Sequence, residues 1–174
     1  MYNQLDEIRR TDHRNYNCFV CCILSHGRQG AVYGSDGNTI MISDLTGLFT
    51  GVKCRSLAGK PKVFFIQACQ GNEKMAGVQP LETDSPGDPQ TIPDGNDFLV
   101  GYSTSPGHVS FRHRTKGSWY ISSLVQALNL HHKELDIQTL LVIVNNHLGK
   151  CSDMAGYKQS APHVSHLTKA LYFK

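Results

Sequence analysis

Three short apolar segments constrain the fold of this chain more than any other feature. They are Asn17–Leu24, Val63–Gln67 and Asp97–Thr104, and the first two are almost continuously apolar. Runs of this length without alternation are typical of strands covered on both faces in a parallel sheet. Helical patterns alternate with these strands along the chain, so we predict an α/β sandwich around a largely parallel sheet.

The segments between and beyond the strands carry helix and turn signals. Apolar residues spaced by three and four predict two amphipathic helices, one around 121–128 and one around 137–148. Asp136 is expected to cap the second helix and Gly149 to end it. The other predicted elements are a helix end within residues 1–16, short strands within 31–41, a helix capped by Ser43 to about Thr50, and a last strand at Leu167–Phe173.

Composition excludes several classes of protein. The chain has 174 residues, which suits a single domain, and 40% of them are apolar. Its formal net charge of +3 is small and dispersed, so we expect no nucleic-acid partner. No apolar run approaches the length of a membrane span, and we see no secretory signal at the start. We therefore expect a cytoplasmic protein with no membrane partner.

Six cysteines raise the question of disulfides or a metal site. An even count fits disulfides in a secreted protein, but without a secretory signal we expect reduced thiols. Cys18, Cys21 and Cys22 share one apolar run and are predicted to pack as small hydrophobes. A zinc site would need a second tight ligand pair at matching spacing, and neighbours such as His131 and His132 do not supply it. We expect no metal and no cofactor.

Two of the predicted strands end in polar turns that carry reactive side chains. One run ends at His26 and Gly27, and the other at Cys69 and Gly71. The carboxyl ends of neighbouring parallel strands meet at one sheet edge, where sites in such folds form. A thiol beside an imidazole at that edge would be a nucleophile with a proton acceptor and donor. Spacing alone leaves another interpretation open, in which Cys69 is a buried strand-end residue and His26 a solvated loop residue.

The literal motifs resemble the caspase family. Residues 67–71 read QACQG, the active-site signature of that family, and the SHG at 25–27 matches its histidine motif. Further matches are GKPK at 59–62, DFL at 97–99, SFR at 110–112, GSWY at 117–120 and LYF at 171–173. The resemblance implies a three-layer α/β/α sandwich and a cysteine protease that cleaves after aspartate. Gln70 and the stretch CFVCCILSHGRQG resemble the initiator branch of caspase-8 and caspase-10, whereas LTKALYF looks more like an executioner caspase.

The resemblance also implies roles for individual residues. Cys69 would attack the scissile carbonyl, and His26 would protonate the leaving amine. The N–H groups of Gly27 and Cys69 would form the oxyanion hole. Arg112 and Gln67 would bind the substrate aspartate, because a buried carboxylate needs a cation and hydrogen-bond donors. The remaining substrate-binding residues would be Val109, Ser110, Phe111 and Trp119, and Trp119 fits a core position equally well.

An acidic, proline-rich connection runs from Asn72 to Asn96. Connections of this length are uncommon unless they are functional or disordered. The resemblance implies a large-subunit part at residues 1–84, a linker at 85–96 and a small-subunit part at 97–174. Leu81–Asp84 resembles an initiator-caspase cleavage sequence, so we expect self-processing after Asp84, with Asp94 as a second candidate. The alternative is that Asp84 is simply an acidic residue in a loop.

Measured against the family, we expect the chain to lack an N-terminal part with two strands, a helix and a second arginine for the substrate aspartate. Arg9, Arg10 and Arg14 are not expected to replace that arginine. The strand at 17–24 would then be an exposed apolar edge. Two functions stay open. One is a caspase-type endopeptidase in apoptotic signalling, activated by dimerisation and self-cleavage. The other is a catalytically impaired module that pairs with a full-length caspase. We expect a homodimer or heterodimer through the strand at Leu167–Phe173.

Overall fold

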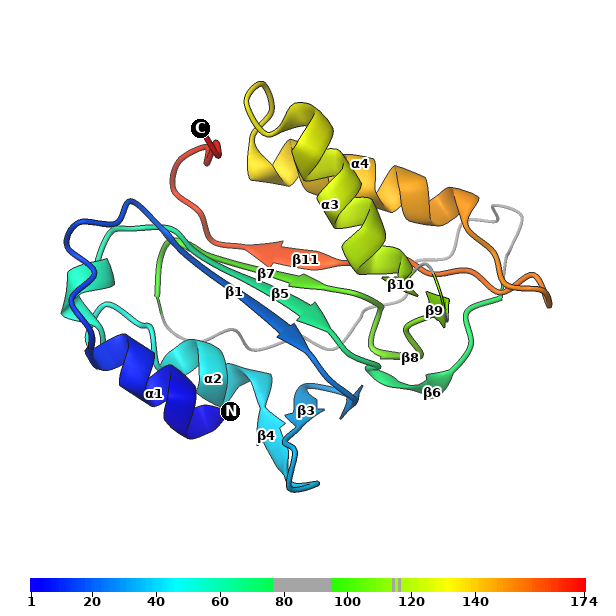
Figure 1. The fold of residues 1–174 in the computed structure, drawn as a ribbon, viewed down its shortest axis with the longest axis horizontal. Coiled ribbons are helices and arrows are strands. Elements are labelled where there is room, and N and C mark those ends of the chain that lie inside the picture. The colour runs from blue at the N-terminus through cyan, green and yellow to red at the C-terminus, as the bar shows by residue number, and fades with distance from the viewer. Residues whose placement is uncertain (77–94, 114, 116) are drawn as a thin grey trace.

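A four-stranded sheet forms the centre of the computed structural model, which describes residues 1–76, 95–113, 115 and 117–174 (Figure 1). The strand order is β1-β5-β7-β11. β1, β5 and β7 are parallel to one another, and β11 is antiparallel to β7. The mostly parallel sheet confirms the predicted fold class. The strands are β1 (Phe19–Leu24), β5 (Lys62–Gln67), β7 (Phe98–Tyr102) and β11 (His163–Ser165).

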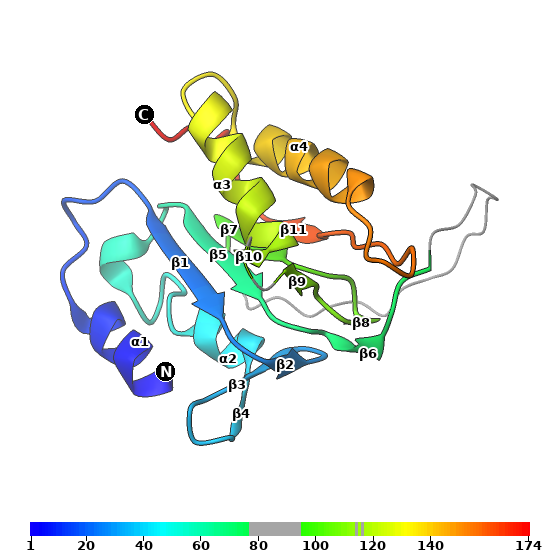
Figure 2. The same ribbon diagram turned by 45° about the vertical axis from the view of Figure 1, so that its right-hand side comes forward.

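Helices cover both faces of this sheet, as Figures 1 and 2 show. One face of the sheet packs against α1 (Tyr2–Arg10), α2 (Ile42–Gly47) and the 3₁₀ helix η1 (Arg55–Leu57). We call the apolar cluster between them the first core. α3 (Trp119–His131) and α4 (Ile137–Lys150) pack on the other face, at the second core. Successive strand residues point to opposite faces, so the apolar run of β5 supplies Phe64 to the first core and Phe65 to the second. Within the described residues, no helix is both long and apolar enough to cross a membrane.

Short strands gather where the parallel strands end, at one side of the molecule (Figure 2). β2 (Gly27–Arg28), β3 (Ala31–Tyr33) and β4 (Thr39–Met41) form an antiparallel sheet after β1. β6 (Gly71–Glu73) pairs with β8 (Gly107–His108), and β9 (Arg112–His113) pairs with β10 (Gly117–Ser118). The segments that carry the predicted reactive residues therefore meet at the carboxyl edge of the sheet.

Helix ends differ from expectation at two points. Asp136 caps α4 as predicted, because its carboxylate accepts hydrogen bonds from two N–H groups of the first turn. The helix nevertheless continues through Gly149 to Lys150. α2 begins at Ile42, one residue before Ser43, and no side chain caps it. Burial of its apolar residues against the sheet, rather than a cap, therefore sets the start of α2.

The predicted position of the last strand was wrong. The strand is β11, and Leu167–Phe173 beyond it is not a strand. The carboxylate of Asp97, a residue with positive φ, accepts hydrogen bonds from the N–H and hydroxyl of Thr168. The Leu171 carbonyl accepts one from the Ile137 N–H at the start of α4. Hydrogen bonds to a loop residue and to the start of α4 thus take the place of strand pairing in this segment. Its apolar side chains pack on the second core.

The prediction that β1 is covered on both faces was also wrong. Val20, Cys22 and Leu24 are exposed, and Leu24 keeps 61% of its accessible surface. Ile23 alternates with them and is buried in the first core. β1 hydrogen-bonds to β5 alone, so it is an edge of the described sheet. The exposed apolar edge that the family resemblance implied is present.

Candidate active site

The register of β1 and β5 brings His26 and Cys69 together. Leu24 pairs with Gln67, so the positions two residues beyond each strand leave the sheet side by side. Gly27 then packs against the nucleophile turn, residues 68–71. A Cβ on Gly27 would lie 2.8 Å from the Cys69 carbonyl oxygen and 2.7 Å from the Ala31 carbonyl oxygen. Glycine is therefore required at this position for the two loops to approach each other.

The predicted catalytic and aspartate-binding side chains line one cavity of about 1300 Å³. His26 is exposed and Cys69 is half-buried, so both can be reached from solvent. Gln67, Ser110 and Arg112 line the same cavity, which continues over the exposed face of α3. The structure thus gathers, in one place, residues that are as far apart in sequence as His26 and Arg112.

The Cys69 sulfur lies against the substrate segment, which we define as Val109–Arg112. It accepts a hydrogen bond from the Ser110 N–H with a nitrogen–sulfur distance of 3.4 Å. In the part of the chain that the structure describes, no hydrogen bond joins Cys69 to His26. Such a bond between nucleophile and base often forms only when substrate is bound.

Gln67 and Arg112, from β5 and β9, both line the cavity. Gln67 Nε2 donates to the Ser110 hydroxyl at 2.7 Å, while its Oε1 is buried and has no partner among the described residues. Arg112 is exposed on β9, where its backbone pairs with Ser118, the N-cap of α3. A guanidinium and a carboxamide at one cavity can together bind a carboxylate.

The other predicted substrate-binding residues lie behind this cavity. Phe111 and Trp119 stack with ring centroids 4.8 Å apart and an angle of 25° between the rings. Trp119 is also half-buried against the second core, which supports the interpretation of this residue as a core position. The Val109 N–H donates to the Glu73 carbonyl at 2.7 Å. Within the described chain, these three side chains do not line the cavity itself.

Two buried glutamines form hydrogen bonds to residues of the site, and no sequence pattern assigned them a role. Gln70 Oε1 accepts from the Gly30 N–H at 3.1 Å, and its Nε2 donates to the Cys69 carbonyl at 3.3 Å. Gln159 Oε1 accepts from the Phe111 N–H at 2.7 Å. Gln70 lies inside the active-site motif, but Gln159 lies in an irregular loop where no sequence pattern marks it.

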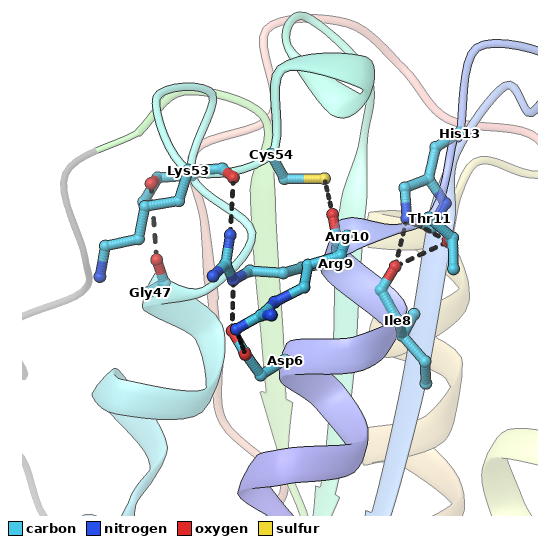
Figure 3. A network of polar contacts seen from close by, with 10 residues as sticks. Asp6, Ile8, Arg9, Arg10, Thr11, His13, Gly47, Lys53 and Cys54 are labelled. Atoms are coloured by element: carbon cyan, nitrogen blue, oxygen red, sulfur yellow. Dashed lines mark hydrogen bonds and ion pairs between the residues drawn. The ribbon is translucent and has the colours of Figure 1, made fainter.

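The three arginines near the N-terminus lie away from the cavity. Figure 3 shows Arg9 and Arg10 at the end of α1, where both contact the Asp6 carboxylate. The hydrogen bond from Arg9 contributes most to the lowered pKa of Asp6. Arg14 is paired with Asp12 in the same way. These arginines are thus engaged with nearby acids.

All six cysteines are free thiols. Desolvation by the surrounding chain raises the pKa of the Cys18, Cys21 and Cys22 thiols, in the case of Cys21 to about 11. They therefore stay protonated near neutral pH, and a protonated thiol is a poor nucleophile and a poor metal ligand. Cys22 is nevertheless exposed, so the prediction that it packs as a small hydrophobe was wrong. In the described ranges, no group of three or more His, Cys, Asp or Glu side chains is placed to hold a metal ion. Asp84 and linker residues 85–94 lie outside these ranges.

Comparison with known proteins identifies close relatives of this chain. The family description "Caspase domain" matches residues 1–172. The chain is 43% identical to caspase-8 of Mus musculus, caspase-3 of Felis catus and caspase-7 of Gallus gallus. These alignments cover 98%, 97% and 99% of this chain, and 39%, 64% and 60% of the respective relative. The chain therefore spans less than two thirds of the length of these relatives, and the equal identities favour none of the three.

Proposed function

The chain belongs to the caspase family, and on this basis we propose that it is a cysteine endopeptidase that cleaves peptide bonds after aspartate in apoptotic signalling. One observation carries the proposal, namely the single cavity that His26, Cys69 and Arg112 line together. Peptide cleavage of this kind needs a nucleophile, a proton donor for the leaving amine and a cation for the aspartate side chain. The cavity contains one residue suited to each task.

In the proposed reaction, the Cys69 sulfur attacks the scissile carbonyl carbon while the thiol proton passes to His26 and the carbonyl π electrons move onto the oxygen. The N–H groups of Gly27 and Cys69 then stabilise the oxyanion, and one such donor is typically worth about 2.7–4 kcal/mol. His26 protonates the leaving amine as the carbon–nitrogen bond breaks, which leaves an acyl group on the sulfur. Water attacks this acyl group and gives one proton to His26. The carbon–sulfur bond then breaks, the acid product leaves, and His26 returns the proton to the sulfur, which restores the thiol and the free imidazole.

Aspartate recognition is proposed to come from Arg112 and Gln67. The guanidinium can donate two parallel hydrogen bonds to the carboxylate. The Gln67 amide already contacts the substrate segment through Ser110, so it can add a donor after rotating about its last bond. An amide substrate side chain of the same size would lack the charge, so asparagine peptides should be poor substrates.

Activation is proposed to involve self-cleavage of a zymogen after Asp84 together with dimerisation. Cleavage would give fragments 1–84 and 85–174 that stay associated, because β5 and β7 come from opposite sides of the cut and pair in the central sheet. β11 is the sheet edge proposed for dimerisation, since it hydrogen-bonds only to β7. We place this activity in the cytoplasm, because six free thiols suit a reducing compartment.

A direct test of self-cleavage compares the wild-type chain with Asp84→Ala at high protein concentration. We expect two fragments of about half the chain length each from the wild type, and the intact chain from Asp84→Ala. Asp94→Ala is the matched control and should be cleaved like the wild type. Wild-type protein that stays intact, or Asp84→Ala that is cut equally well, would contradict processing at Asp84.

A second candidate function rests on the open edge of β1. Val20 and Leu24 are exposed on a strand that, among the described residues, pairs with β5 alone, and such an edge favours pairing with another strand. The chain could therefore act as a catalytically impaired module that pairs with a full-length caspase. A binding-only module has no chemical need for both Cys69 and His26, so we place the endopeptidase first.

Turnover of a fluorogenic peptide that ends in aspartate tests the proposed function. We expect cleavage by the wild type, none by Cys69→Ala, and no change for Cys22→Ala, an exposed thiol that lies outside the cavity. The asparagine version of the peptide should be cut far more slowly. No turnover that depends on Cys69, at high protein concentration and with full-length caspase absent, would favour the interaction module.

A further inference from the structure

We propose that Gln159 is a positioning residue, which holds the substrate segment Val109–Arg112 in register with the nucleophile turn. This role rests on the proposed protease function. Gln159 lies in the loop between α4 and β11, which passes close to β9 (Figure 2). It touches neither the thiol nor the imidazole, so it would act through the residues that it holds.

The side-chain amide of Gln159 makes two short hydrogen bonds in a buried position. Its Oε1 accepts from the Phe111 N–H at 2.7 Å, and its Nε2 donates to the Ser103 carbonyl at 2.6 Å. Only 3% of Gln159 is exposed, so water cannot replace either partner. One end of the group must accept and the other must donate, which a carboxamide does without carrying charge.

Ser103 continues the connection to the nucleophile turn. Its hydroxyl accepts from the Ala68 N–H at 3.2 Å and donates to the Ala68 carbonyl at 3.0 Å. Ser103 is completely buried, and its own N–H bonds to the Ile66 carbonyl of β5. A continuous set of hydrogen bonds, buried as far as Gln159 and part-buried at Phe111, therefore runs from the residue before Cys69 to the residue before Arg112.

The substrate segment has few other backbone bonds to the sheet. Residues 109–111 form no strand. On the far side, the Phe111 carbonyl accepts from the Trp119 N–H at 3.2 Å. Ser110 is bonded separately, to Gln67 and to the Cys69 sulfur. Gln159 supplies the bond that ties Phe111, the neighbour of Arg112, to Ser103 just after β7. Without it, the segment should shift and take Arg112 with it, while His26 and Cys69 stay on the paired ends of β1 and β5. Substrate binding should suffer more than the chemical step.

Steady-state kinetics with the aspartate peptide test this division. Gln159→Met keeps the side-chain volume and removes both bonds, so we expect KM to rise about tenfold or more and kcat to change by less than about threefold. Gln138→Met, on the exposed face of α4, is the matched control and should change neither. A KM for Gln159→Met equal to that of the wild type would overturn the positioning role and leave the protease proposal intact.

Gln159→Glu gives a second, independent variant. A protonated Glu can accept and donate like the amide, whereas the carboxylate can only accept and would face the Ser103 carbonyl. Burial raises the pKa of such a carboxyl group. The ratio of the KM of Gln159→Glu to the KM of the wild type, both measured at the same pH, should therefore fall toward one as the pH is lowered. A ratio that does not change with pH would count against the role.

Amide hydrogen exchange tests the contact without turnover. The Phe111 N–H should be protected in the wild type and in Gln138→Met, and it should exchange faster in Gln159→Met. Rapid exchange in the wild type would overturn the proposal even if the protein is a protease. If the wild type shows no turnover that depends on Cys69, the protease proposal fails and the positioning role falls with it, whatever the protection of Phe111.

Discussion

The two sides of the candidate active site are built differently. On the nucleophile side, His26 and Cys69 follow directly from the paired strands β1 and β5. On the substrate side, residues 109–111 form no strand and are held by individual hydrogen bonds from side chains and from backbone groups. A strand ladder fixes its residues through many cooperative bonds, whereas a loop held by single contacts moves when one is lost. Changes on the nucleophile side should therefore act mainly on kcat, and those on the substrate side mainly on KM.

Arg112→Ala should have the largest effect and should act on the substrate side. Removing one partner of a desolvated charge pair costs about 2–5 kcal/mol, which corresponds to a loss of roughly 30-fold to several thousand-fold in kcat/KM. Arg112→Lys should recover only part of this, because an ammonium cannot make the paired hydrogen bonds of a guanidinium. Arg55→Ala, an exposed arginine outside the cavity, is the control. Equal kcat/KM for Arg112→Ala and the wild type would remove Arg112 from the site.

Gly27→Ala should break the nucleophile side. The added methyl group would overlap the carbonyl oxygens of Ala31 and Cys69 and push the two loops apart. Misplacement of reacting groups by about 1 Å can cost about 100-fold in rate, so we expect kcat to fall by about that factor with a smaller change in KM. Gly149→Ala in α4 meets open space and should leave both constants unchanged. A normal kcat in Gly27→Ala would show that the close approach of the loops is not needed.

Gln70→Met is the counterpart, on the nucleophile side, of Gln159→Met on the substrate side, so the two variants together test the difference between the sides. Gln70 is 1% exposed and links the Gly30 N–H to the Cys69 carbonyl. Loss of these bonds should loosen the loop that carries His26, so we expect kcat to fall about tenfold while KM is largely kept. If both glutamine variants raise KM equally, the proposed division between the two sides is wrong.

Asp136→Ala, remote from both sides, should have the smallest effect on activity. The Thr139 hydroxyl, followed by N–H groups of the first turn of α4, lowers the pKa of Asp136. A carboxyl with a lowered folded-state pKa stabilises the protein above its unfolded pKa, and this contribution is lost as the pH falls through the folded pKa. We expect the free energy of unfolding to drop by about 1 kcal/mol at neutral pH. Denaturant titrations should show that the difference in unfolding free energy between Asp136→Ala and the wild type disappears in acid. At each pH, the kcat of Asp136→Ala should equal that of the wild type.

The nucleophile side could largely be predicted from the sequence, and the substrate side could not. A continuous apolar run that ends in a polar turn indicates a strand with polar residues at its carboxyl end, and the literal motifs then assigned the reactive roles to His26 and Cys69. Gln159 contacts Phe111 across 48 positions of an irregular chain, and no local pattern encodes such a contact. The Arg112 assignment came from its motif alone.

The two wrong predictions about the fold, for Leu167–Phe173 and for the burial of β1, also concern features that tertiary contacts determine. Leu167–Phe173 has a strand-like composition, but the bonds from Thr168 to Asp97 and from Ile137 to the Leu171 carbonyl hold it in another shape. The apolar residues of β1 led us to predict that other elements bury both faces of this strand. Whether a helix lies over Val20 and Leu24 depends on the arrangement of other elements, and in the described structure none does.

Covalent trapping tests the central claim most directly. The wild-type chain would be treated with two electrophilic peptides that differ only in a terminal aspartate or asparagine, and the modified cysteine would be located by mass spectrometry. We predict labelling of Cys69 alone among the six cysteines, fast with the aspartate probe, slow with the asparagine probe, and lost in Arg112→Ala. Labelling of another cysteine, or equal labelling of Cys69 by both probes, would contradict an aspartate-directed cysteine nucleophile in this cavity.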